Sequence, residues 1–302
     1  MKKLIIAGGS GYLGTAIANY FKDQFDEVVT LSRKHKNLIE NLRTVIWDAQ
    51  NLDTWYKEIE NAEVIINMTG RSVDCRYNEV NKNLIMNSRV DSTTILGKAI
   101  SICKNPPKIW LNSSTATIYR HSLDKEMTEE NGDIGSDFSV NVAKAWEHAF
   151  FSSKTPQTRK VALRTSIVLG KNGGALQSLK KITTLGLSGK QGNGKQKFSW
   201  IHEEDFLKSI DFIICKQNIQ GPINIVSPTP TTNNYLMKLM RKKLRVSFGI
   251  PAPKPILKIG AFLIQTEAEL LLKSRNVIPE RLLKEGFSFK YYHLTNALED
   301  LL

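Results

Sequence analysis

Cysteine is scarce in this chain of 302 residues, and its three copies lie far apart at Cys75, Cys103 and Cys215. An odd number of widely spaced cysteines argues against a disulfide framework and favours a reducing compartment. The five histidines are equally scattered, and none stands at ligand spacing from a cysteine or a carboxylate. The sequence therefore predicts neither a disulfide-stapled fold nor a structural metal site.

Long apolar runs are also missing. No stretch approaches the roughly 20 apolar residues that span a bilayer, so we expect no membrane partner. The apolar run at residues 4–7 stops at Gly8, whereas a secretion leader needs an apolar core of about 7–15 residues. Acidic residues are fewer than basic ones, 29 against 42. Because the basic residues are spread along the chain without interleaved stacking aromatics, we interpret them as a solvated surface and expect no nucleic-acid partner.

Glycine, by contrast, is concentrated directly after the first apolar run, in the segment "GGSGYLG". Gly9, Gly11 and Gly14 match G-x-G-x-x-G, and Gly8, Gly11 and Gly14 match the related G-x-x-G-x-x-G. The following "TAIANYFKD" has helical spacing. A strand, a glycine loop and a helix N-terminus in this order are typical of a phosphate-binding turn of a dinucleotide site. The middle glycine would let the backbone approach a pyrophosphate, and the last would let the helix pack closely.

Short apolar segments then alternate with helical ones. Strands are predicted at 3–7, 27–31, 44–47, 63–67, 108–112 and 160–169, and the longest helix at about 78–104. This alternation is typical of an α/β fold with a Rossmann-like, doubly wound parallel sheet. We expect a dinucleotide-binding domain over residues 1–169, to which 200–226 returns. A smaller, mainly helical substrate or lid lobe is expected over 170–302.

The end of the second predicted strand indicates which dinucleotide binds. A carboxylate about 20 residues beyond the glycines is typical of NAD sites, but this stretch reads Ser32-Arg33-Lys34. An arginine here suits a 2′-phosphate, so we predict NADP as the cofactor. Further cofactor contacts are expected after the glycine turn, where strands end. The expected set is Gly8, Ser10, Gly11, Tyr12, Leu13, Gly14, Ser32, Arg33, Lys34, Asp48, Met68, Thr69, Gly70, Ser113 and Ser114.

Three of these segments, "GGSGYLG", "INMTG" and "NSSTATIYR", resemble extended short-chain dehydrogenases/reductases of the epimerase/dehydratase branch. The segments "GGAL", "FSWIHEEDF", "GPINIVSPTP" and "VIPERLLKEGFSF" are similar to an atypical subgroup. Its members are epimerase-family proteins with a conserved C-terminal domain of unknown function, sometimes labelled cell-division inhibitors. The resemblance covers essentially the whole chain. It implies a nicotinamide cofactor and a cytoplasmic protein, and it supplies no substrate.

The catalytic pattern of that family is incomplete here. Typical members use Ser or Thr followed by Tyr-x-x-x-Lys on a helix, and Thr115 occupies the Ser/Thr place. Anchored on Glu147, the tyrosine and lysine places fall at Ser139 and Ala143, neither of which can do the chemistry. Three interpretations remain open: another acid/base, cofactor binding without turnover, or a regulator.

Substitute groups are sought in the loops after the strands. As catalytic residues we consider Thr115, Tyr119 and Cys75, and as substrate-binding residues Arg71, Arg76, Lys195, Trp200 and His202. The segment 189–195 fits G-x-x-x-x-G-K, but Gln196 stands where a P-loop needs Ser or Thr. We therefore interpret it as a flexible lid.

These features predict an NADP-dependent oxidoreductase or epimerase-like enzyme, monomeric or homodimeric. Its substrate would be a small, anionic hydroxyl or carbonyl compound. The alternative is a non-catalytic NADP-binding redox sensor or partner-binding protein.

Overall fold

The computed structural model describes residues 2–34, 42–257, 267 and 269–302. Seven parallel strands form the main sheet, in the order β11-β6-β5-β4-β1-β2-β3. Their bounds are β1 Lys3–Ala7, β2 Glu27–Ser32, β3 Leu42–Ile46, β4 Val64–Asn67, β5 Ile109–Thr115, β6 Arg159–Thr165 and β11 Gly221–Ile225. The chain builds β2 and β3 on one side of β1 and β4 on the other, so the strand order reverses beside β1. Ligands of such sheets bind at this reversal, outside the carboxyl ends of the strands.

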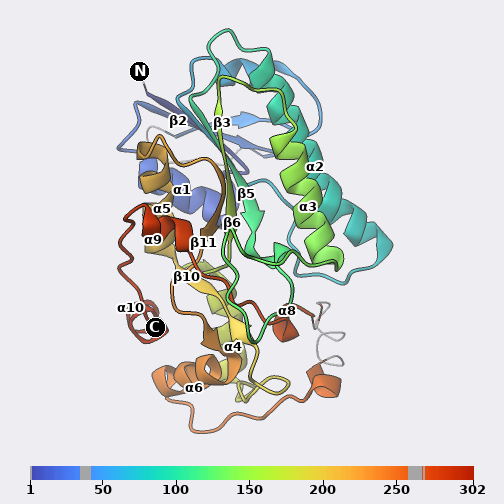
Figure 1. Cartoon of the computed structure of the whole chain (residues 1–302), viewed down its shortest axis with the longest axis vertical. Coiled ribbons are helices and arrows are strands. Elements are labelled where there is room, and N and C mark those ends of the chain that lie inside the picture. The colour runs from blue at the N-terminus through green and yellow to red at the C-terminus, as the bar shows by residue number, and fades with distance from the viewer. Residues whose placement is uncertain (1, 35–41, 258–266, 268) are drawn as a thin grey trace.

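Helices cover both faces of the sheet (Figure 1). On one face lie α1 (Tyr12–Phe21) and α5 (Glu203–Cys215), and on the other lie α2 (Glu79–Ser101), α3 (Phe138–Phe151) and the short helix η1 (Thr54–Ile59). Successive strand residues point to opposite faces. Leu4 and Ile6 of β1 accordingly pack against α1 and α5, while Ile5 packs against α2. Burial on both faces explains why these strands are continuous apolar runs, and the predicted fold class is confirmed.

The sixth predicted strand, 160–169, is in fact two strands. After β6 the chain leaves the main sheet at Ser166, whose N–H donates to the Ile225 carbonyl at 3.2 Å. It continues as β7 (Ile167–Gly170), which pairs with β10 (Trp200–His202) and β8 (Gly173–Gly174) in a second sheet. A continuous apolar run does not reveal such a change of sheet, because residues on both sides of it are buried.

The smaller lobe has its own core at the lower end of the molecule in Figure 1. It contains α4 (Ala175–Thr184), α6 (Asn233–Leu244), α10 (Leu294–Leu301) and the short pair β9 (Lys197–Phe198) and β12 (Thr231–Thr232). The short helices η2 (Ala116–Ile118), α8 (Glu269–Leu272) and α9 (Glu280–Lys284) complete the described elements.

The chain crosses more than once between the two parts. Residues of α5 and β11 pack in the same core as β1 and α1, whereas Trp200 packs in the core of the lobe. Leu282 and Phe287, which the predicted boundary assigns to the lobe, join the core of β1 and α1. The lobe and the sheet are therefore linked by several chain segments.

Candidate functional site

The glycine loop lies between β1 and α1, beside the reversal in strand order. Gly11 is the residue before α1, and it gives the helix no side-chain cap. The first N–H groups of a helix have no partner within it, and the helix dipole makes this end favourable for an anion. The loop therefore presents an uncapped, positively polarised helix end to the space above the sheet.

The glycines of this loop meet different constraints. A Cβ on Gly14 would lie 2.4 Å from the Gly8 oxygen, so only glycine lets α1 pack this closely against the loop. A Cβ on Gly11 would meet only the Gly8 oxygen at an ordinary 3.5 Å, and the Gly11 backbone is extended, at φ −73°. The fold itself thus tolerates a side chain at residue 11, and the space in front of it is open.

Two neighbouring strand ends contact this loop. The Ser32 hydroxyl, at the end of β2, donates to the Ser10 hydroxyl at 2.9 Å. Arg33 and Lys34 follow Ser32 on the surface, and both are exposed. From the end of β4, the Thr69 hydroxyl is buried without a hydrogen-bond partner in the part of the chain that the structure describes. Polar side chains thus follow both strands that neighbour β1 in the sheet, and Ser32 bonds directly to the glycine loop.

Other predicted cofactor residues use their polar side chains within the protein. Asp48 is exposed, but its carboxylate accepts the backbone N–H groups of Gln50 and Asn51, both at 2.9 Å. Ser114 is buried and donates to the Glu147 carboxylate at 2.6 Å. Tyr12 donates its hydroxyl to the Glu203 carboxylate, and burial raises its pKa. These interactions leave the Tyr12 and Ser114 hydroxyls engaged with residues of other helices.

The predicted catalytic role of Tyr119 does not fit its surroundings. Its side chain is 1% exposed, and its hydroxyl donates to Asn224 and accepts from Arg164, both at 2.9 Å. Arg164 also makes a two-pronged ion pair with Glu147, with both distances 2.8 Å. Burial lowers the pKa of Arg164, but Glu147 outweighs burial and raises it overall. Tyr119 therefore belongs to a buried network between α3 and β11, where it has no free hydroxyl proton for a substrate.

Two of the predicted substrate residues, Trp200 and His202, are also structural. Trp200 is fully buried and donates its indole N–H to the Thr229 carbonyl at 3.2 Å. His202 caps α5, because its Nδ1 accepts the Glu204 N–H at 3.0 Å, and its ring stacks on Tyr291. Burial lowers the pKa of His202, and Asp300, 3.4 Å from its Nε2, opposes that shift. Helix α5 begins directly after "SWIH", and His202 is its N-terminal cap.

The segment predicted as a flexible lid is tied to the lobe. Gln191 and Asn233 exchange two hydrogen bonds, of 3.0 and 2.9 Å, and the Gly189 N–H donates to the Ile250 carbonyl. Gly192 and Gly194 take positive φ angles, of 59° and 73°. The glycines thus serve tight turns rather than a hinge. Lys195 is exposed at the surface of this segment.

The remaining candidates lie after β4 and β5. Arg71 is exposed and donates to the Asn81 side chain at 3.1 Å, and Arg76 lies 3.2 Å from the Glu267 carboxylate. The thiol of Cys75 lies 3.8 Å from the Ser72 carbonyl. Thr115 caps η2 by accepting the Thr117 N–H at 3.1 Å. The loop after β4 thus carries an exposed cation, Arg71, and a half-buried one, Arg76.

Two side chains next to these loops, Tyr77 and Arg275, are not among the residues predicted from the sequence. The Tyr77 ring packs edge-on against Phe138 at the start of α3, with ring centroids 5.0 Å apart. Arg275 donates its Nε to the Thr117 hydroxyl at 3.1 Å. Tyr77 directly follows Arg76, so a closer inspection of that loop would have found it. Arg275 lies far away in the sequence, and no local pattern marks it.

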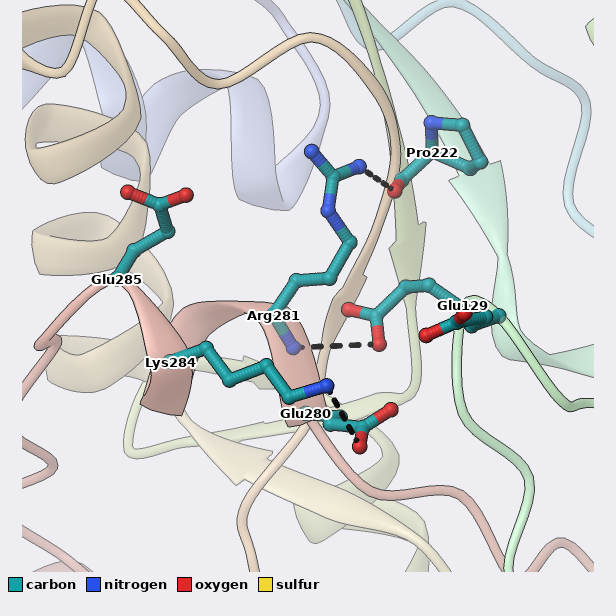
Figure 2. A pocket seen from close by; sticks show the side chains of 7 residues that line it. Glu129, Pro222, Glu280, Arg281, Lys284 and Glu285 are labelled. Atoms are coloured by element: carbon teal, nitrogen blue, oxygen red, sulfur yellow. Dashed lines mark hydrogen bonds and ion pairs between the residues drawn. The ribbon is translucent and has the colours of Figure 1, made fainter.

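A cavity of about 450 Å³ lies elsewhere, beside the edge strand β11 (Figure 2). In its lining, Lys284 pairs with Glu280 at 3.0 Å, and Arg281 donates to the Pro222 carbonyl at 2.8 Å. Burial raises the pKa of Glu129. Pro222 is near the amino end of β11, so this cavity is remote from the strand ends where ligands of such sheets bind.

Two kinds of site are not found in the described part of the chain. No group of three or more His, Cys, Asp and Glu side chains there could hold a metal ion. None of the described helices combines the length and apolar character needed to cross a membrane. All three cysteines are free thiols.

Comparison with known proteins gives consistent matches over the whole chain. Residues 4–226 match the NAD dependent epimerase/dehydratase family, and residues 252–301 match a domain of unknown function, DUF1731. An epimerase family protein of Staphylococcus epidermidis is 30% identical, with 100% of this chain and 99% of that protein covered. The mouse epimerase family protein SDR39U1 is 30% identical, with 99% of both covered. The crystal structure of human SDR39U1 isoform 2 with NADPH matches with a TM-score of 0.86 and 28% identity. That match covers 99% of this chain and 98% of the human one.

Proposed function

Because the chain belongs to the NAD dependent epimerase/dehydratase family, we propose that it binds NADP(H) at the glycine loop. We further propose that it acts as an oxidoreductase or epimerase-like enzyme. The observation that carries the proposal is the open space at Gly11, in front of the uncapped N-terminus of α1. A pyrophosphate fits such a place, because backbone N–H groups and the helix dipole both favour an anion there.

We propose that the Arg33 guanidinium binds the 2′-phosphate of the cofactor. It is exposed directly after β2, where NAD sites carry a carboxylate, and Ser32 connects this strand end to the glycine loop. The crystal structure of human SDR39U1 contains NADPH, which supports a phosphorylated cofactor for this chain. The buried Thr69 hydroxyl, which lacks a partner among the described residues, is a proposed cofactor contact at the end of β4.

A bound nicotinamide would supply or accept a hydride at the carboxyl edge of the sheet. The protein would hold the cofactor, position a small hydroxyl or carbonyl compound and move its proton. Arg71 and Arg76 stand in the loop after β4 and favour an anionic substrate. NADP binding without turnover is the second candidate, because Ala143 lies fully buried in an apolar cluster with Ile118 and Val277 and brings no cation to the site.

Isothermal titration calorimetry with NADPH and NADH tests this proposal on the wild type and on Arg33→Ala. We expect the wild type to prefer NADPH. Arg33→Ala should lose about 1.5–3 kcal/mol of NADPH binding, the range for hydrogen bonds to charged groups, and little NADH binding. Lys57→Ala, which removes an exposed cation on η1, is the matched control. Equal affinities of the wild type for the two cofactors would contradict the assignment to NADP.

A further inference from the structure

A tyrosine hydroxyl without a partner is buried at the carboxyl edge of the sheet. It belongs to Tyr77, in the loop between β4 and α2, and no other described residue offers it a hydrogen bond. The hydroxyl faces Ser139 at the start of α3, but the two groups do not reach hydrogen-bond geometry. A buried polar group left unpaired costs about 1–3 kcal/mol. At a candidate site, an unpaired buried hydroxyl indicates that a bound ligand supplies its hydrogen-bond partner.

The loop that carries Tyr77 is held in place from two sides. The Tyr77 N–H donates to the Glu267 carboxylate at 2.9 Å, and the same carboxylate lies 3.2 Å from Arg76. The Tyr77 ring packs against Phe138. The hydroxyl position is therefore fixed by contacts of the backbone and the ring, and it does not depend on any bond of the hydroxyl itself.

Two guanidinium groups approach Tyr77 without a carboxylate partner of their own in the described ranges. Arg89 of α2 donates to the backbone oxygens of Arg71 and Ile85, both at 3.0 Å, and lies over the Trp146 ring. Arg275 comes from the C-terminal segment and is fixed through Thr117, in the first turn after β5. Both guanidinium groups act on one phenol, and a neighbouring cation stabilises a phenolate or another anion. The Glu269 and Asp137 carboxylates also act on Arg275.

Burial and the charges around Tyr77 determine whether its phenol is protonated when no substrate is bound. Burial raises the pKa of Tyr77, and Glu269 and Cys75 act in the same direction. Ser139 and Arg275 oppose these shifts, without cancelling them. Burial lowers the pKa of Arg89 to about 10, which still leaves it charged at neutral pH. Burial also lowers the pKa of Arg275, and Glu269 and Asp137 oppose that shift. Because its own pKa is raised, Tyr77 is a protonated phenol at rest, as a proton donor requires.

We propose that Tyr77 is the catalytic acid/base of this protein and that Arg275 is its positioning cation. This inference rests on the proposed function. In the reducing direction the Tyr77 O–H bond breaks, and its proton passes to the substrate carbonyl oxygen. The carbonyl carbon meanwhile receives the hydride of the reduced cofactor. The product is an alcohol and an oxidised cofactor, and a solvent proton restores the phenol. In the oxidising direction the phenolate takes the alcohol proton.

The first test follows the phenol itself and needs no turnover. Difluorotyrosine, whose phenol ionises in an accessible pH range, is placed at position 77 and titrated by fluorine NMR with NADPH bound. We expect Arg275→Met to raise the midpoint by about one pH unit, because a neighbouring cation favours the phenolate. Arg275→Lys should stay close to the wild type. A midpoint that Arg275→Met leaves unchanged would overturn the inference.

The second test measures NADPH oxidation with phenanthrenequinone as the carbonyl probe. Tyr77→Phe keeps the ring on Phe138 and should slow turnover by about 100-fold or more, the range of general acid catalysis. NADPH affinity should stay within about twofold of the wild type, since no cofactor contact is removed. Tyr235→Phe, an exposed tyrosine on α6, is the matched control and should leave the rate unchanged.

The outcomes separate the two proposals. A wild type that does not bind NADPH would contradict the proposed function. NADPH binding together with full turnover in Tyr77→Phe would contradict only the role of Tyr77.

Discussion

Gly11, directly before α1, and Gly14, in the first turn of α1, stand three residues apart, yet they should respond to substitution in opposite ways. Gly11→Val places a side chain in the open space before α1, where the protein offers only one ordinary contact, at 3.5 Å from the Gly8 oxygen. Gly14→Ala forces a Cβ to within 2.4 Å of the Gly8 oxygen and 2.8 Å of the Gly9 Cα. The first change should remove cofactor binding and spare the fold, whereas the second should damage the fold.

The expected magnitudes follow from these contacts. At Gly11 the extended backbone suits any residue, and replacing a glycine in a compatible conformation stabilises a protein by about 0.4–1 kcal/mol, through the unfolded chain. At Gly14 alanine gains about 1 kcal/mol in helix propensity. The overlap with backbone atoms costs about 1–3 kcal/mol or more, so the net change should be destabilising.

Urea unfolding followed by circular dichroism measures the stability of both variants, and calorimetry with NADPH measures binding. We expect Gly11→Val to unfold at or slightly above the wild-type midpoint and to show no heat of NADPH binding. Gly14→Ala should unfold at lower urea. If Gly11→Val binds NADPH as tightly as the wild type, the open space is not the pyrophosphate site. If it unfolds as early as Gly14→Ala, the assignment of their roles is wrong.

Two further predictions concern the buried network and the histidine cap. Arg164→Met leaves the Glu147 carboxylate buried without its cation. Urea denaturation should therefore show a free energy of unfolding lower by about 3–5 kcal/mol. A loss below about 1 kcal/mol would refute the role of the ion pair. Burial holds the pKa of His202 below its ordinary 6.5, so its contribution to stability is complete above pH 6.5 and is lost as the pH falls through the folded-state pKa. His202→Asn, which can still cap α5, should remove this part of the acid destabilisation in pH-dependent thermal unfolding, and an unchanged pH profile would contradict the prediction.

Local patterns were sufficient for the elements that carry the site. The strand at 3–7 has the predicted bounds, and the long helix begins one residue after Asn78, which caps it through the Asn81 N–H. Their signals, a buried apolar run and a capping residue, are confined to neighbouring residues. The same local reasoning placed Arg33 directly after the second strand.

The interpretation of single side chains failed where tertiary partners decide their role. Tyr119 is bound by Arg164 and Asn224, which come from two other strands, and His202 stacks on Tyr291 near the C-terminus. Local sequence patterns do not show partners that are distant along the chain. Arg275 was missed for the same reason, since only the folded chain brings it beside the loop after β4.

A crystal structure of the protein with NADPH would locate the cofactor and so show whether the glycine loop binds it. We expect the pyrophosphate on the backbone of Gly11 at the start of α1. We also expect the 2′-phosphate within about 3 Å of the Arg33 guanidinium, the distance of a charge-assisted hydrogen bond. A 2′-phosphate that contacts neither Arg33 nor Lys34, or a pyrophosphate bound away from Gly11, would contradict NADP binding at the glycine loop.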